Sequence, residues 1–209
     1  IASISYVGYI GVKLIGPSRG LGLTAFFGGL ASSTAVTLSF TRLAKTHHNL
    51  KPTLAGGILL ASAIMFPRIV VEVSVTNTKL ILPLLPPLSL MLLTTLGLAF
   101  WLWRGCTSPH TSEQTQPELK NPFELLPAIQ FGVLLAAVFF LSKALLNTFG
   151  EGSIYLLSLL SGVVDVDAIT LSLGRMSQDE LSSSMAINGI IIATLSNTFF
   201  KCLFFVFII

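Results

Sequence analysis

Two aspartates interrupt a long apolar part of the sequence. Asp165 and Asp167 lie near the middle of the apolar segment 153–174. A carboxylate in such a segment is costly unless it is paired or protonated, so it usually faces a bundle interior or a water-filled cavity. A spacing of two residues puts the carboxylates about 200° apart on a regular helix. Both therefore reach one cavity only if the helix is broken, which Gly162 and the small Ser161 would permit.

Small hydroxyl side chains gather in another apolar segment, 21–43. Ser32 and Thr34 stand there at positions that correspond to the two aspartates in an internal repeat described below. Carboxylate and hydroxyl oxygens together suit a hard cation or a proton-linked solute. For each hydroxyl alone, helix packing is the simpler explanation, whereas packing does not require the charge of an aspartate. The predicted binding residues are Asp165, Asp167, Ser32, Ser33, Thr34, Thr37 and Thr170.

Three further ionisable residues are candidate charge partners for the aspartates. Arg68 and Glu72 lie four residues apart and can pair on one helical face, either as a structural ion pair or as a gate. Pro67 should kink that helix, because proline removes a backbone donor. Lys201 is placed either to neutralise an aspartate across the bundle or to extend its charge to the membrane surface.

Enzyme chemistry finds little support in the motifs. The sequence contains no His-Glu-x-x-His zinc motif, no Gly-x-Ser-x-Gly elbow and no phosphate-binding loop. His47 and His48 adjoin in a basic loop without metal-ligand partners, and the two aspartates share one segment, unlike a protease dyad. A net charge of +3 gives no reason to expect nucleic acid binding. We predict no enzyme and no cofactor, and the sequence does not identify a metal.

The composition indicates an integral membrane protein. The chain is 53% hydrophobic and 10% charged, whereas soluble domains carry about 25% charged residues; its mean hydropathy is +0.84. Apolar runs of about 18 to 25 residues, the length of a membrane-spanning helix, recur along the chain. Blocks such as 81–103 are apolar on all sides, unlike a barrel strand. The sequence predicts an all-α membrane protein with about seven transmembrane helices, near 1–16, 21–43, 53–76, 80–103, 124–148, 153–174 and 184–208.

One segment, 104–122, is polar and carries three prolines. It is typical of a flexible linker between two halves. Basic residues concentrate in this linker and in the loops that follow the second and sixth predicted spans, whereas Arg19 and Lys79 fall on the other side. The positive-inside rule then makes the linker cytoplasmic, with the start of the chain inside and its end outside.

Two parts of the sequence are alike. Residues 29–42 align without gaps with 162–175, and after a one-residue slip 57–62 aligns with 189–194. Apolar helices rich in small residues resemble one another, but an arginine and a Thr-Leu-Ser in the same register favour a duplication. We predict two three-helix repeats in the same orientation. The predicted divisions are repeat 1 (1–76), a linking helix (77–103), the polar linker (104–122) and repeat 2 (123–209).

Four motifs resemble the family called domain of unknown function 4010. They occupy 28–40, 55–68, 120–125 and 165–172, and the resemblance covers essentially the whole chain. Members commonly follow an MgtC/SapB-type membrane domain in one bacterial protein. The resemblance therefore implies a multi-pass protein of the bacterial inner membrane, with such a domain preceding Ile1. It implies no mechanism, because the family has no established activity.

The preferred functional prediction is transport or channel-like permeation of a small ion or solute. It rests on the duplication, the aspartates and the hydroxyl cluster, and it places a midplane site between the repeats. The alternative is a regulatory or assembly module that acts with the MgtC-type domain and does not transport. The expected partners are the lipid bilayer and a small cation or solute; self-association into a homo-oligomer is left open.

Overall fold

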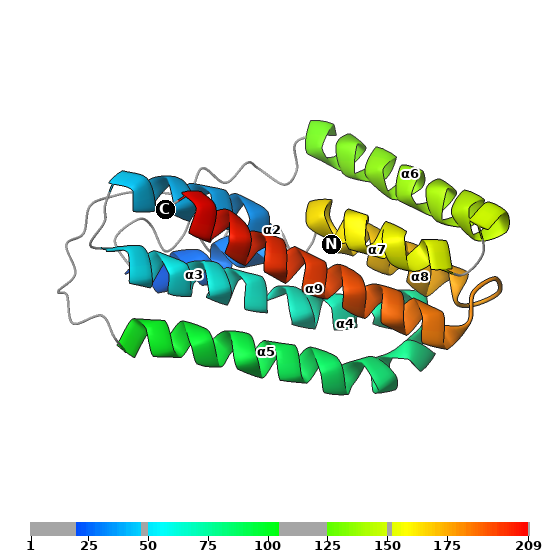
Figure 1. Cartoon of the computed structure of the whole chain (residues 1–209), viewed down its shortest axis with the longest axis horizontal. Helices are drawn as coiled ribbons and strands as arrows, with labels where there is room; N and C mark the ends of the chain where they lie inside the picture. Colours follow the sequence, from blue (N-terminus) through cyan, green and yellow to red (C-terminus); the bar gives the residue numbers. More distant parts are fainter. Residues whose placement is uncertain (1–19, 47–49, 105–124, 150–151, 209) are drawn as a thin grey trace. The chain divides into compact units, whose positions relative to one another are not determined.

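The computed structural model describes residues 20–46, 50–104, 125–149 and 152–208, which form helices without a β-strand (Figure 1). The all-α prediction is confirmed for these residues. The predicted span 1–16 and nearly all of the linker 104–122 lie outside them. The described elements are α2 (Gly20–Thr46), α3 (Lys51–Ala63), α4 (Met65–Thr76), the 3-10 helix Thr78–Leu80, α5 (Ile81–Arg104), α6 (Leu125–Phe149), α7 (Gly152–Val164), α8 (Val166–Met176) and α9 (Ser183–Ile208).

Three described stretches are long and apolar enough to cross a membrane. They are Lys51–Thr76, Thr78–Arg104 and Ser183–Leu203, and they match the predicted spans 53–76, 80–103 and 184–208. Their length and composition indicate a membrane protein. Other apolar helical stretches among the described residues are shorter, so the count of seven spans stays a prediction.

The chain divides into two compact units. Unit 1 takes its residues from Ile1–Pro67, Leu90–Glu124 and Lys201–Ile209, and unit 2 consists of Arg68–Ser89 and Leu125–Phe200. One boundary falls next to Pro67, where the predicted kink is found: α3 ends at Ala63, and α4 begins after a turn at Ile64. The physical reason is that the proline ring clashes with the carbonyl four residues earlier, which is that of Ala63.

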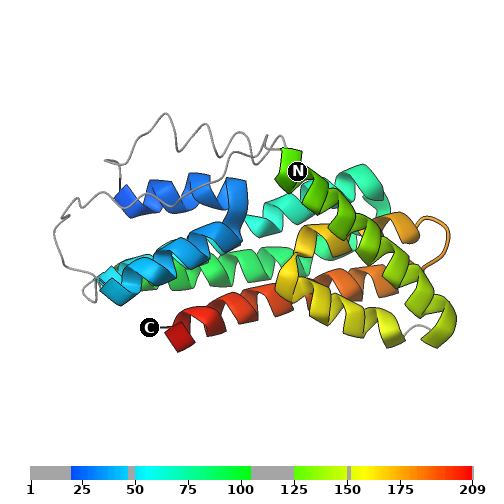
Figure 2. The same cartoon turned by 90° about the horizontal axis from the view of Figure 1, so that it is seen from above.

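In unit 1, α2 folds back on itself at Ser32. This residue is extended, with φ −164° and ψ 106°. Ala25 and Phe40 would lie about 22 Å apart along a straight helix. Both nevertheless lie against Gly57 of α3, where a Cβ would be 3.5 Å from the Ala25 Cβ and 3.0 Å from the Phe40 ring. We call α2 hairpin 1, and Figure 2 shows its reversal in blue.

Hairpin 1 packs on α3 through a close helix contact and an apolar core. A Cβ at Gly29 would lie 2.7 Å from the Ala61 Cα, so glycine is needed for the two backbones to approach. Trp103 of α5 covers the same helix and donates a hydrogen bond of 3.1 Å from its indole to the Thr53 carbonyl. The buried core consists of Ala25, Val36, Phe40, Leu43, Ala44, Leu54, Ile58 and Ala61.

In unit 2, α7 and α8 form hairpin 2 (152–176), which turns at Asp165. Ser158 and Leu173 are as far apart in sequence as Ala25 and Phe40, and both lie against Gly189 of α9. A Cβ at this glycine would be 2.9 Å from the Ser158 Oγ and 2.6 Å from the Leu173 Cδ1. A Cβ at Gly162 would lie 2.7 Å from the Ala193 Cα. The contacts of Gly162 with Ala193 and of Leu173 with Gly189 lie at positions that the alignment pairs with Gly29, Ala61, Phe40 and Gly57 of unit 1. Ser158 and Ala25 each lie four residues before the aligned segments.

The two hairpins correct the prediction that 21–43 and 153–174 each form one spanning helix. Both segments are long enough to cross, but each turns back at a residue whose side chain caps the next half-helix. Ser32 Oγ accepts a hydrogen bond from the Ala35 amide at 3.2 Å. Asp165 Oδ1 accepts one from the Asp167 amide at 2.9 Å. Such caps satisfy donors that a helix start leaves free.

Helix directions are defined inside unit 2, whereas the relative orientation of the two predicted repeats involves both units and stays a prediction. The helix α4 runs in the same direction as α8, because Arg68 contacts Asp167 and Thr76 contacts Gly174. In contrast, α8 runs opposite to α9, to which the short segment 177–182 joins it. Therefore α4 and α9 run in opposite directions within unit 2. The prediction assumed that 153–174 crosses the membrane, whereas hairpin 2 reverses the chain within it.

Candidate functional site

The candidate site in unit 2 is built on the turn of hairpin 2. Asp165 has extended backbone angles, φ −157° and ψ 124°, and it is the N-cap of α8. Asp167 lies in the first turn of the same helix. Both carboxylates are thus at a helix N-terminus, where free amides and the helix dipole favour negative charge. The broken helix that both aspartates would need to reach one cavity is present.

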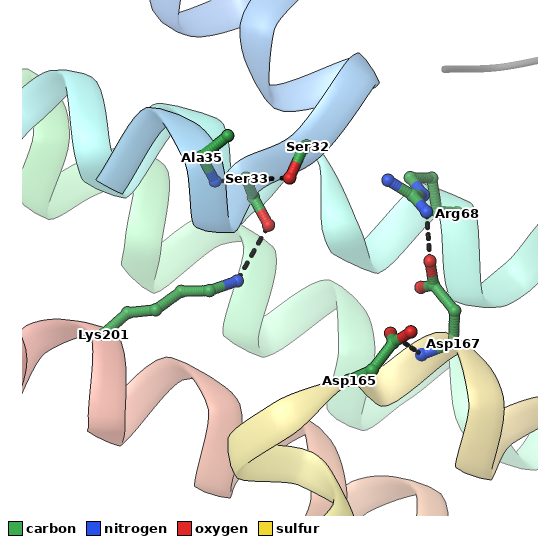
Figure 3. Close-up of polar contacts among 7 residues, drawn as sticks. All are labelled: Ser32, Ser33, Ala35, Arg68, Asp165, Asp167 and Lys201. Atoms are coloured by element: carbon green, nitrogen blue, oxygen red, sulfur yellow. Dashed lines mark hydrogen bonds and ion pairs between the residues drawn. The ribbon is translucent and has the colours of Figure 1, made fainter. Parts of the chain in front are cut away.

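Arg68 of α4 is the direct partner of Asp167. Its Nη2 donates to Asp167 Oδ2, and the two side chains are only 10% and 13% exposed (Figure 3). The helical spacing in the sequence predicted a pair of Arg68 with Glu72 instead. The two do share one face of α4, but the guanidinium forms its ion pair with the carboxylate of α8. A buried guanidinium and carboxylate gain from this pairing, because each would otherwise be an unpaired charge.

Glu72 is the most unusual side chain of the site. It is 4% exposed, and neither carboxylate oxygen has a hydrogen-bond partner among the described residues. Its charged neighbours are Asp167, Arg68 and Asp165. Burying a carboxylate without partners and beside other carboxylates is costly. Such groups often mark functional positions in membrane proteins.

The seam between α4 and α8 shows what Glu72 faces. Arg68, Glu72 and Thr76 follow one another at helical spacing on α4, as Asp167, Thr170 and Gly174 do on α8. Arg68 and Asp167, which begin the two rows, form the ion pair. Thr76 and Gly174, which end them, are in contact, since a Cβ at Gly174 would lie 3.0 Å from the Thr76 Cβ. Glu72 is therefore level with Thr170. Thr170 is 0% exposed, and its hydroxyl also lacks a described partner.

The predicted residues of hairpin 1 and Lys201 lie in unit 1. Lys201 Nζ donates to Ser33 Oγ at 2.8 Å, as Figure 3 shows. Thr37 is buried and donates to the Ser33 carbonyl at 2.8 Å, which is a packing role within its own helix. Ser32 is the cap described above, and Thr34 is exposed. A shared site for these hydroxyls and the aspartates involves both units and stays a prediction.

A metal site is not apparent in the part of the chain that the structure describes. Its His, Cys, Asp and Glu side chains form no group of three that could hold a metal ion. The amide and hydroxyl groups of α9 serve the hairpin instead. Asn197 Nδ2 donates to the Gly162 carbonyl at 2.7 Å, and Ser196 Oγ donates to the Leu159 carbonyl at 2.8 Å. These bonds hold the last turns of α7 against α9.

Sequence reasoning missed the fold-back at Ser32 and the prominence of Glu72. A signal for the first was available. Each hairpin turns three residues after a glycine, Gly29 or Gly162, at a Ser or Asp that can cap a helix. For Glu72, the pairing rule for residues four apart pointed to Arg68, and only the position of α8 shows that the arginine is bound elsewhere.

Comparison with known proteins gives a family but no activity. Residues 1–208 match the family described as domain of unknown function (DUF4010). An uncharacterized protein of Aquifex aeolicus (strain VF5) is 37% identical over 184 residues, which cover 86% of this chain and 78% of that protein. No solved structure matches the chain significantly. The chain belongs to the DUF4010 family.

Proposed function

We propose that this protein carries a small ion or solute across the bacterial inner membrane, and that the turn of hairpin 2 supplies binding groups. The observation that carries the proposal is a helix broken within an apolar segment so that its N-terminus presents two carboxylates beside buried Arg68 and Glu72. A role in packing alone would not require three carboxylates in such a segment.

The arrangement of the helices supports this proposal. Secondary transporters often contain discontinuous helices whose ends, set inside the membrane, bind substrate and coupling ions. Many are built from repeats of inverted topology. The predicted duplication of residues 29–42 and 162–175 fits a transporter built from repeats, and the relative orientation of these repeats stays a prediction. We also propose that the chain crosses the membrane several times, that it is not an enzyme, and that it follows an MgtC/SapB-type domain in the full protein.

A regulatory or assembly module is the second candidate, and one observation favours it. Arg68 pairs directly with Asp167, and glycines bring the helices of hairpin 2 close to α9. A buried ion pair in a tightly packed unit is compatible with a structural role. This candidate leaves unexplained why Glu72 is buried without a partner among the described residues.

Uptake by the purified full-length protein in liposomes tests the proposal. The panel contains monovalent and divalent cations, organic cations and amino acids, and it is run on the wild type, Asp165→Asn and Glu180→Gln. Asn keeps the capping oxygen but removes the charge, so we expect Asp165→Asn to fold and to lose uptake. Glu180 forms an exposed pair with Lys143 in the same unit and is the matched control. Uptake that is unchanged in Asp165→Asn, or absent for the whole panel in wild type, contradicts the proposal.

A further inference from the structure

The middle of the seam between α4 and α8 contains buried oxygens without described partners. They belong to Glu72, which is 4% exposed, and to Thr170, which is 0% exposed. On one side of this pair the seam is closed by Arg68 and Asp167, and on the other by Thr76 against Gly174. Glu72 and Thr170 thus both bury polar oxygens between these two contacts.

The charges around Glu72 do not balance if every carboxylate is ionised. Its charged neighbours are Arg68 on its own helix and Asp165 and Asp167 at the start of α8. The other unit 2 helices contribute no charged neighbour among the described residues: α9 has none between Ser183 and Phe200, and Lys143 of α6 pairs with Glu180. Arg68 is already bound to Asp167. An ionised Glu72 would therefore be a buried charge beside like charges, which is strongly unfavourable.

We infer that Glu72 holds a proton while Arg68 is bound to Asp167, and that a cationic ligand with N–H donors releases this proton by taking the place of Arg68 on Asp167. This inference rests on the proposed carrier function. It identifies the carried ligand as an organic cation with N–H donors and the coupling ion as a proton. The group now bound to Asp167 is a guanidinium, so an ammonium or guanidinium ligand offers the same donors to the same oxygens.

The exchange keeps the charge of the site constant. The ligand brings one positive charge to Asp167, and Arg68, once displaced, reaches Glu72 one turn further along α4. The Glu72 O–H bond breaks, its electron pair stays on the carboxylate, and the proton leaves to water. One positive charge has entered and one has left. The buried region therefore never holds an additional unpaired charge, which its low dielectric would make costly.

A polar cavity lies at the end of the same seam, beyond the contact of Thr76 with Gly174. It has a volume of about 390 Å³. Thr76 lines this cavity and donates to the Glu72 backbone carbonyl at 3.1 Å, so the cavity begins one helical turn from Glu72. The cavity is lined by Ser74, Val75, Thr76, Asn77, Thr78, Lys79, Ser177, Gln178 and Ser183.

Proton release in detergent solution tests the inference apart from transport. Guanidinium and methylammonium are added to the full-length protein in weak buffer with a pH indicator, and Na⁺ and K⁺ serve as cations without N–H donors. In wild type we expect one proton to be released for each bound organic cation. The affinity should then weaken about tenfold for each pH unit of acidification, as one linked proton requires. In Glu72→Gln the displaced Arg68 has no carboxylate to pair with, so the cation should bind about tenfold or more weakly than in wild type, without proton release and with an affinity that does not change with pH. Glu180→Gln should behave as wild type.

Several outcomes would overturn the inference. They are the absence of organic cation binding, binding without proton release in wild type, and equal release in Glu72→Gln. A large drop in the Tm of Glu72→Gln would also overturn it, because Gln closely resembles the protonated side chain. If proton release follows this pattern but liposomes show no uptake, the inference stands and the proposed carrier function fails. If uptake occurs without proton release, the carrier function stands and the inference fails.

Discussion

At the scale of single residues, the two aspartates of hairpin 2 have different roles. Asp167 is bound to Arg68, whereas Asp165 caps α8 with a carboxylate oxygen. The sequence showed two similar carboxylates in one apolar segment, and it could not assign these roles, because the partner lies far away in the chain. The consequences of substitution should therefore differ between the two positions.

Asp167→Asn should strongly destabilise the protein. The substitution removes the carboxylate that binds the buried Arg68 guanidinium, and breaking a buried pair in this way costs about 3–5 kcal/mol, of which a new pair of Arg68 with ionised Glu72 recovers a part. Thermal unfolding in detergent measures the loss. Glu180→Gln is the matched control, because its pair with Lys143 is exposed and such pairs contribute about 0–1 kcal/mol. Equal Tm values for the two variants would show that the Arg68–Asp167 pair does not stabilise the fold.

Asp165 allows its cap and its charge to be separated. Asp165→Ala removes the oxygen that accepts from the Asp167 amide, and the loss of an N-cap costs about 1 kcal/mol. Asp165→Asn keeps a capping oxygen and should leave stability close to that of wild type. Ser32→Ala in unit 1 removes the corresponding cap and should cost a similar amount. Unfolding measurements that find Asn as destabilising as Ala at position 165 would contradict the capping role.

At the scale of elements, the sequence predicted helix positions better than helix paths. The bounds of α5, α6 and α9 lie within one residue of the predicted spans 80–103, 124–148 and 184–208. The segments of hairpins 1 and 2 were both predicted to cross the membrane, with a break in 153–174 left open, since apolar length is the same for a helix that crosses and for one that turns back. The turn depends on tertiary contacts, in which Ala25 and Phe40 meet at Gly57 while Ser158 and Leu173 meet at Gly189.

Glycine substitutions test these close helix contacts. A Cβ at Gly29 or Gly162 would meet the backbone of Ala61 or Ala193 at 2.7 Å, where no side-chain rotation can relieve the clash. We expect Gly29→Ala and Gly162→Ala each to destabilise the protein by about 1–3 kcal/mol, the usual cost of overpacking. Thermal unfolding measures both.

Gly97→Ala is the control for these glycine variants. It lies inside α5, and a Cβ there would have no described neighbour within 4 Å. Alanine favours a helix by about 1 kcal/mol over glycine, so this variant should be neutral or slightly stabilised. Full stability of Gly29→Ala and Gly162→Ala would show that these helices do not pack as described.

At the scale of the whole molecule, the path through the membrane depends on which segments cross it. A helix that crosses brings the chain to the other side, whereas a hairpin returns it to the side from which it came. The topology predicted from the basic loops counted 153–174 as a crossing, and it therefore put Lys79 and Arg175 on opposite sides. In unit 2, however, Asn77 Nδ2 donates to Ser177 Oγ at 2.9 Å. The segments that follow α4 and α8 thus meet at one end of this unit.

Cysteine labelling decides between these topologies. Lys79→Cys and Asp179→Cys place exposed thiols on the two segments, in a background where Cys106 and Cys202 are replaced by serine. The segments that follow α4 and α8 meet at the same end of unit 2. A membrane-impermeant maleimide should therefore label both positions from the same side of intact cells or oriented vesicles. Labelling after permeabilisation controls for thiol reactivity. If the two positions react from opposite sides, 153–174 crosses the membrane as the sequence predicted, and the fold-back at Asp165 is wrong.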